Sequence, residues 1–271
     1  MFTEQYMRCA LAAAAILGPL CALLGVFVTA RRLSFFSDTI AHGALAGVAI
    51  GIWLGIADLT LPMVIFSLAV AGAMVWLKEN TDLLNDSIMA LLLSGSVAIG
   101  ILILSLAQTN RGELHGYLFG DVLAVEWRDV GMAAVLAALV GGGLFTQLTP
   151  LTLLTANEEL ANVSGVHVRR LNYAFIVVLT VTVALSIRLL GVVLVTSLLV
   201  IPPAIARPLS VNLRQQLVLS VIAGLVGSIG GTMLAWRLNV PCGPTIVLSC
   251  IALFILSLIG GKVIRRNPNL A

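Results

Sequence analysis

The chain has 271 residues, of which 60% are hydrophobic and 10% are charged, and its formal net charge is +3. A soluble domain carries roughly 25% charged residues and could not hide this much apolar surface, so a water-soluble fold is excluded. The basic residues lie in short loops rather than in a patch, which argues against a nucleic-acid partner.

Long uncharged stretches follow one another from end to end of the chain. A helix needs roughly 20 apolar residues to cross the hydrocarbon layer. Because backbone groups have no water partner in lipid, and because these runs lack period-two alternation, the spanning elements are expected to be helices. We predict an all-α polytopic membrane protein with eight or nine transmembrane helices, forming one domain over residues 1–271 in a lipid bilayer. The candidate segments are roughly 7–30, 39–57, 61–77, 87–107, 130–149, 171–190, 191–206, 216–236 and 244–261.

Two of these segments need comment. The first is predicted to be a retained helix, because its apolar run is longer than the roughly 7 to 15 residues of a signal-peptide core. The segment 191–206 is short and ends in Pro202-Pro203, so it is either a regular span or a broken one. This segment decides between eight and nine spans.

Basic residues in short loops indicate the orientation, because lysine and arginine stay on the cytoplasmic side during insertion. If nine segments cross and the C-terminal tail is inside, ten of the 15 basic residues are cytoplasmic, which supports that orientation. The inner residues are Arg31, Arg32, Lys78, Arg169, Arg170, Arg207, Arg214, Lys262, Arg265 and Arg266, and the outer ones are Arg8, Arg111, Arg128, Arg188 and Arg237.

Asp38 and His42 are four residues apart at the start of an otherwise uncharged segment. On a helix this spacing puts a carboxylate and an imidazole on one face, where both can reach one ion. An ionisable side chain at membrane depth is costly unless it is paired or lines a water-filled path. The spacing leaves two interpretations open: a metal site, or an Asp38 that caps the helix beside a histidine bonded to a neighbour.

Zinc usually takes four ligands in a tetrahedron, and one chain offers two here. Two copies that face each other would supply two carboxylates and two imidazoles. Such a nitrogen and oxygen site suits zinc, and it also suits manganese or ferrous iron.

A glycine stripe follows His42 at every fourth residue: Gly43, Gly47, Gly51 and Gly55. It removes the side chains from one helix face and lets another backbone approach closely. The partner is either a neighbouring helix of the same chain or a second copy of the protein.

The loop from Thr155 to Val166 contains a helix-start signal and then a stop at Gly165. It is predicted to form a short surface helix with Glu158 and Glu159 near its start, where the helix dipole favours acids. On the cytoplasmic side such a helix is a candidate dock for a partner protein. A solvated connecting loop is the alternative.

No motif for catalysis is present. Gly260 to Val263 lacks the leading glycine and the final Ser or Thr of a Walker A sequence, and HExxH and GxSxG patterns are absent. The cysteines show no CxxC spacing and are expected to pack as small hydrophobes. They are Cys9, Cys21, Cys242 and Cys250.

Four stretches carry a resemblance to a known family: Arg31 to His42, Tyr117 to Val125, Leu189 to Ala204 and Pro241 to Thr245. Together they resemble the metal-uptake ABC permease family, and most of all the permeases of bacterial high-affinity zinc uptake systems. The departures are Pro203 and Cys242, where smaller residues are expected; they can alter local helix geometry.

The resemblance implies the following roles. Asp38 and His42 would pass the metal, and the loop from Glu158 to Gly165 would engage an ATPase. The assembly would contain two permeases, two cytoplasmic ATPases and a periplasmic or extracellular metal-binding protein, in the bacterial inner membrane. Zinc would be the transported substrate, with no permanently bound cofactor.

Two alternatives to a zinc permease stay open. Manganese or iron is the substrate alternative within the family. An ATP-independent secondary transporter would need coupling-ion sites and usually shows inverted repeats, which this sequence does not display. A non-transporting membrane anchor is a third and weaker interpretation.

Overall fold

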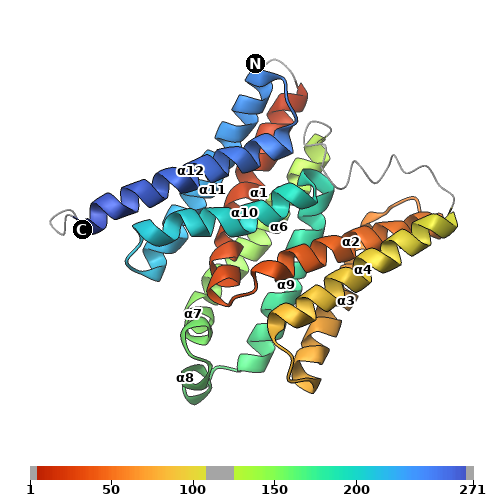
Figure 1. Cartoon of the computed structure of the whole chain (residues 1–271), viewed down its shortest axis with the longest axis horizontal. Coiled ribbons are helices and arrows are strands. Elements are labelled where there is room, and N and C mark those ends of the chain that lie inside the picture. The colour runs from red at the N-terminus through yellow and green to blue at the C-terminus, as the bar shows by residue number, and fades with distance from the viewer. Residues whose placement is uncertain (1–4, 108–124, 267–271) are drawn as a thin grey trace. The chain divides into compact units, whose positions relative to one another are not determined.

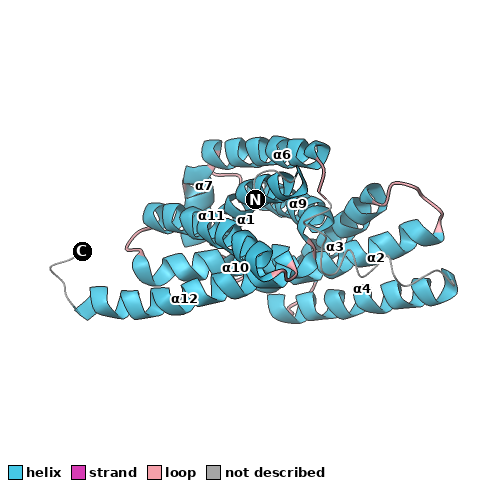
Figure 2. Ribbon diagram, turned by 90° about the horizontal axis from the view of Figure 1, so that it is seen from above, coloured by secondary structure: helices cyan, strands magenta, loops and turns pink. Residues whose placement is uncertain are grey.

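The computed structural model describes residues 5–107 and 125–266. Every regular element in these two ranges is helical (Figures 1 and 2), which confirms the all-α prediction. All of the stretch Tyr117 to Val125 except its last residue lies outside the described residues. The α-helices are α1 (Gln5–Ala30), α2 (Ser34–Trp53), α3 (Thr60–Asn80), α4 (Asn85–Ala107), α6 (Trp127–Thr146), α7 (Leu148–Ala156), α8 (Glu158–Val163), α9 (Val168–Leu190), α10 (Val192–Ala206), α11 (Leu213–Leu238) and α12 (Cys242–Arg266).

Within the described residues, nine helices are long and apolar enough to cross a membrane. They correspond one to one with the nine predicted segments. The doubtful seventh segment is among them, because α10 runs through both prolines and its apolar stretch extends to Leu209 in a following 3₁₀ turn.

The boundaries of α2 differ from the predicted 39–57. The helix begins at Ser34 and ends at Trp53, and Gly55 lies in the following turn with φ at +67°. The predicted start was too late because polar side chains at the beginning of the helix lower its local hydropathy. Inside the helix their hydroxyls bond to the preceding turn, as Ser37 Oγ does to the carbonyl of Ser34 at 3.0 Å.

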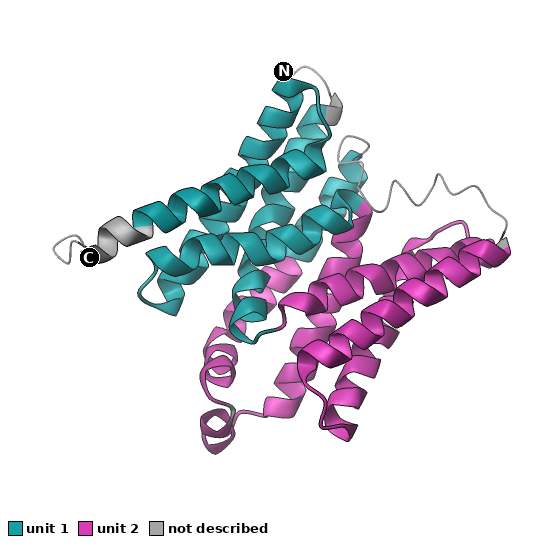
Figure 3. Cartoon of the chain, viewed as in Figure 1, with its two compact units in different colours: residues 1–32, 119–137, 189–271 teal, residues 33–118, 138–188 magenta. Residues whose placement is uncertain are grey.

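The described helices divide into two compact units, shown in two colours in Figure 3. Unit 1 comprises residues 1–32, 119–137 and 189–271, and unit 2 comprises residues 33–118 and 138–188. The prediction that all 271 residues form one domain stays a prediction.

In unit 1, α1 packs closely on α10 and α11. A Cβ added to Gly18 of α1 would lie 2.9 Å from the carbonyl oxygen of Gly224 on α11, so the two backbones nearly touch. Ser220 Oγ donates to the carbonyl of Ala22 at 3.0 Å across the same contact. Small residues therefore replace bulky ones where these helices cross.

The two prolines of α10 are accommodated by this close packing. A proline has no N–H, so Pro203 leaves the carbonyl of Leu199 without its usual helical partner. That oxygen points at Gly25 of α1, where an added Cβ would come within 2.0 Å of it. Gly25 thus gives room to the carbonyl that Pro203 frees, and the helix continues past Pro202-Pro203.

In unit 2, α2 packs on both α3 and α4. A Cβ on Gly47 would lie 2.7 Å from the carbonyl oxygen of Pro62 on α3, and Gly43 and Gly51 also face side chains of the region 59–70. The partner of the glycine stripe is therefore α3 of the same chain. Gly55 is not part of the packed face, because it lies beyond the helix end.

Candidate functional site

Asp38 and His42 lie in the second and third turns of α2, and both are half-buried. Phe35, three residues before Asp38, is 60% exposed, and Leu45, three residues after His42, is half-buried. Because these spacings follow the helical repeat, the four side chains form one accessible face of α2. The predicted carboxylate and imidazole therefore share that face.

The opposite side of α2 is fixed by packing. Thr39 is buried, and its Oγ1 bonds to the carbonyls of Phe35 at 2.9 Å and of Met89 on α4 at 3.3 Å. Ile40 and Ala41 are fully buried beside it. This side anchors α2 on α4, so the register of Asp38 and His42 on the accessible face is set by buried neighbours.

The capping interpretation of Asp38 is wrong. The residue at the N-cap position of α2 is Leu33, and four helical residues precede Asp38. A side chain in the second turn cannot satisfy the free N–H groups of the first turn as an N-cap does. A carboxylate at this position in an apolar helix needs another reason to be there.

Within the described part of the chain, no three His, Cys, Asp or Glu side chains come together as a metal-binding group. The four cysteines lie in α1 and α12 and are buried, with Cys250 Sγ filling the space over Gly227. The role of Asp38 and His42 as metal ligands stays a prediction, with two donors per chain. A four-ligand site would need a second copy.

The predicted short helix with an acidic start is present as α8, at residues Glu158–Val163. Asn157 caps it: its Oδ1 accepts from the N–H groups of Glu159 at 2.9 Å and Leu160 at 3.1 Å. Gly165 ends it with φ at +78°, a backbone conformation that glycine adopts without strain. The role of this helix in binding an ATPase stays a prediction.

The sequence analysis did not anticipate two features of the α8 region. Leu160 and Val163 are 53% and 87% exposed, and they are three residues apart, so they form an apolar face beside the acidic start. The helix α7 also precedes α8 where a loop was expected. Pro150 in the first turn of α7 was the available signal, because proline favours helix starts.

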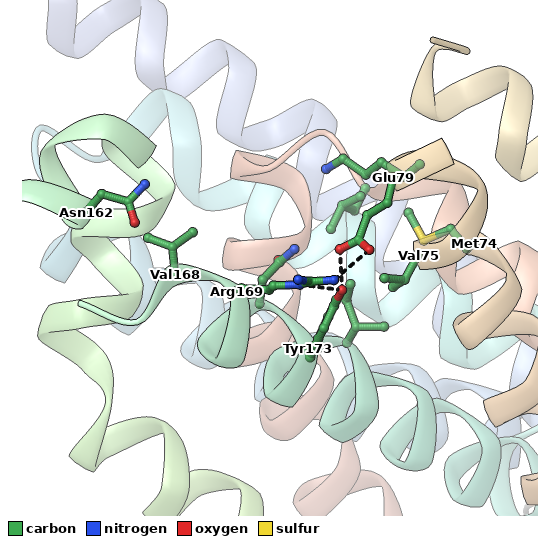
Figure 4. Close-up of a pocket in the computed structure, with 11 residues that line it drawn as sticks. Met74, Val75, Glu79, Asn162, Val168, Arg169 and Tyr173 are labelled. Atoms are coloured by element: carbon green, nitrogen blue, oxygen red, sulfur yellow. Dashed lines mark hydrogen bonds and ion pairs between the residues drawn. The ribbon is translucent and has the colours of Figure 1, made fainter. Parts of the chain in front are cut away.

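A polar cluster joins α3 to α9 at one end of each helix (Figure 4). Arg169 Nη2 contacts Glu79 Oε2 at 2.9 Å, and the Tyr173 hydroxyl donates to the other carboxylate oxygen of Glu79. Arg169 Nε donates to the Tyr173 hydroxyl at 3.0 Å. Sequence reasoning missed this cluster, although Arg169 and Tyr173 stand four apart at a helix start.

A cavity of about 570 Å³ opens beside the cluster. Asn162 of α8 lines it together with Glu79, Arg169 and Tyr173 (Figure 4). Lys78 also lines the cavity and adds a second positive charge. The cavity therefore brings together side chains from α3, α8 and α9, all within unit 2.

The other ends of the same two helices are also joined. Arg188 of α9 donates to Thr60 Oγ1 at 2.6 Å and lies 4.0 Å from Asp58. Hydrogen bonds from the Thr60 hydroxyl and N–H, with a contribution from the Arg188 charge, lower the pKa of Asp58. Asp58 is therefore ionised at neutral pH, and α3 is bonded to α9 at both ends.

Comparison with known proteins gives consistent matches over nearly the whole chain. The ABC 3 transport family profile matches residues 3–261. The chain is 34% identical over 248 residues to the high-affinity zinc uptake system membrane protein ZnuB of Haemophilus influenzae, covering 90% of this chain and 93% of that protein. It is 28% identical over 265 residues to the manganese import system permease protein ScaB of Streptococcus parasanguinis, covering 98% and 94%.

A solved structure matches over a similar length. In the structure of PsaBC from Streptococcus pneumoniae in complex with Fab, one chain superposes with a TM-score of 0.83 and 26% sequence identity. The superposition covers 94% of this chain and 92% of that chain.

Proposed function

This chain belongs to the ABC 3 transport family, and we propose that it is the permease subunit of an ATP-driven importer that carries zinc across the inner membrane of a bacterium. Its 34% identity to a zinc uptake membrane protein supports zinc as the substrate. The 28% identity to a manganese permease keeps manganese as the second candidate, and iron remains the further alternative because the same donors suit it.

The observation that carries the proposal is the placement of Asp38 and His42 on one accessible face of an apolar helix, away from its cap. A divalent ion in a low-dielectric site needs nearby negative charge. Two copies of the chain would bring two carboxylates, which balance the two positive charges of the ion, and two neutral imidazoles, which complete a tetrahedron. Without thiolates such a site can release its ion, as a transport pathway requires.

The permease makes and breaks no covalent bond in this mechanism. A metal-binding protein delivers the ion at the outer side, and two ATPase subunits bind ATP at the inner side. Their closure displaces α8, whose capped start and exposed Leu160 and Val163 form a compact contact surface. The bundle then changes access to the Asp38 and His42 pair from one side of the membrane to the other.

The proposal is tested by reconstituting the permease with its ATPase in vesicles and supplying loaded binding protein. Zinc uptake that requires ATP and both partners is the expected result. Uptake that persists without the ATPase would contradict the proposal and favour a secondary transporter. Competition by manganese or ferrous iron at equal concentration distinguishes the three metals.

The contact with the ATPase is tested separately by co-purification. Replacing Glu158 and Glu159 with lysine places positive charge at the positive end of the α8 dipole and removes the acidic contact surface. We expect the double variant to insert normally and to recover less ATPase. Unchanged recovery with unchanged transport would remove α8 from the contact.

A further inference from the structure

The proposed mechanism must connect α8, which the ATPase displaces, with α2, which carries Asp38 and His42. The cluster of Glu79, Arg169 and Tyr173 lies between these two parts of unit 2. Arg169 is the second residue of α9, and a loop of four residues, 164–167, separates α9 from α8. Val166 N–H donates to the carbonyl of Ala161, a fully buried residue of α8, at 3.0 Å. A displacement of α8 therefore reaches the start of α9 through a short, bonded connection.

From the cluster, packing contacts continue to Asp38 and His42. Glu79 is in the last turn of α3, and α3 lies against α2 with almost no space between the backbones at Gly47. The helix α2 carries Asp38 and His42. Two closely packed helices cannot slide independently, so a movement of α3 changes the position of that pair.

Stability does not explain the cluster, because its ion pair is exposed. The side chains of Arg169 and Glu79 are 74% and 41% accessible, and exposed ion pairs add little to folding free energy. Both carboxylate oxygens of Glu79 are nevertheless engaged, by two different side chains of α9. Two bonds to one carboxylate fix the orientation of the end of α3 relative to α9, and a positioning role requires such a fixed orientation.

The cavity beside the cluster does not suit the transported ion. Lys78 and Arg169 give it two positive charges against the single carboxylate of Glu79, whose oxygens are already bonded. A divalent cation would be repelled there. The cavity is therefore not a site for the transported ion, and the bonds to be explained are those between α3 and α9.

We propose that Glu79 is a positioning residue for transport: through Arg169 and Tyr173 it fastens the inner end of α3 to α9, so that α3 and the metal-bearing α2 follow the movement of α8. This inference rests on the proposed function. The Arg188 to Thr60 hydrogen bond joins the other ends of the same two helices. Because both ends are bonded, α3 and α9 move together. Without the Glu79 bonds, α9 can rotate about the Arg188 contact.

The test measures zinc ions transported per ATP hydrolysed in reconstituted vesicles that contain the ATPase and loaded binding protein. Glu79→Ala is expected to lower this ratio by about five-fold or more while ATPase recovery and basal ATP hydrolysis stay at the wild-type level. Tyr173→Phe, which removes one hydroxyl, should lower it less. The matched control is Asp82→Asn, which removes an exposed negative charge near the same helix end and should leave the ratio unchanged.

A charge exchange distinguishes the loss of the bond between α3 and α9 from local structural damage caused by the substitution. Glu79→Arg combined with Arg169→Glu restores an ion pair between the same helices, and it should recover part of the ratio that either single change loses. A wild-type ratio for Glu79→Ala, or failure of the exchange to recover any of the loss, would overturn the inference. If the wild-type protein itself shows no ATP-dependent zinc uptake, the proposed function fails, and the two failures are thus distinguishable.

Discussion

The packing of α2 on α3 makes a quantitative prediction for Gly47→Ala. The added Cβ would lie 2.7 Å from the carbonyl oxygen of Pro62 and 2.8 Å from the Cα of Met63, whereas ordinary contact begins at 3.4 Å. Both obstacles on α3 are backbone atoms, so no rotamer change relieves the clash, and α2 must move away from α3. Overpacking of this kind costs about 1–3 kcal/mol. The higher helix propensity of alanine offsets about 0.5–1 kcal/mol of that cost.

Two further glycines provide the comparison. Gly72→Ala on α3 meets no atom within 4 Å, so it should gain only the helix-propensity term. Gly43→Ala meets a methyl group of Val70 at 3.1 Å, which can yield, so an intermediate effect is expected. The free energy of unfolding is measured by denaturant titration in micelles for all three variants. If Gly47→Ala were as stable as Gly72→Ala, the close backbone contact between α2 and α3 would be refuted.

The remaining predictions concern α10 and α8. Gly25→Ala should lower the thermal midpoint clearly more than Gly230→Ala, because its Cβ would meet the Leu199 carbonyl oxygen, whereas the Gly230 position is open; equal midpoints would contradict the account of the proline-containing helix. Leu160→Asp should reduce co-purification of the ATPase, while Val211→Asp, at another exposed apolar position, should not; an equal reduction would point to a general effect of surface charge. Asn157→Ala removes the cap of α8 at a cost of about 1 kcal/mol, so it should weaken ATPase recovery less than Leu160→Asp does; a larger loss would contradict that ranking.

Much of the fold could be predicted because membrane solvation imposes a simple rule: long apolar runs become helices. The exceptions arise where a local property was outweighed by a tertiary contact. Pro202 and Pro203 made a broken segment plausible, and only the position of Gly25 on another helix explains why α10 continues. A single-sequence pattern holds no information about which helix lies opposite.

The candidate site shows the same division. The shared face of Asp38 and His42 could be predicted because both lie on one helix, where the four-residue spacing determines it, whereas their role as ligands stays a prediction. The acidic α8 could be predicted from its own start and stop residues. Glu79 and its partners could not, because Arg169 and Tyr173 are 90 and 94 residues away in sequence. Contacts at such separations depend on how the helices are arranged.

The proposed donors also bear on the identity of the metal. A carboxylate and an imidazole from each of two chains would suit zinc, manganese and ferrous iron alike. The resemblance to zinc uptake permeases predicts zinc, and the relatives that the chain matches support it. Competition between metals in the vesicle assay measures the preference directly.

The most direct test of the central claim is zinc uptake by the Asp38→Asn protein in vesicles with ATPase and loaded binding protein. Asparagine keeps the shape of the side chain and removes its charge, and His42→Ala provides the matching removal of the imidazole. Without the carboxylate, a positive charge of the ion loses its partner, and removing one member of a buried charge pair costs about 2–5 kcal/mol, so uptake should fall by roughly 30-fold or more. We predict a loss of that size for Asp38→Asn with normal insertion and normal ATPase recovery. Near-normal uptake at matched protein level would contradict the assignment of Asp38 as a ligand of the transported metal.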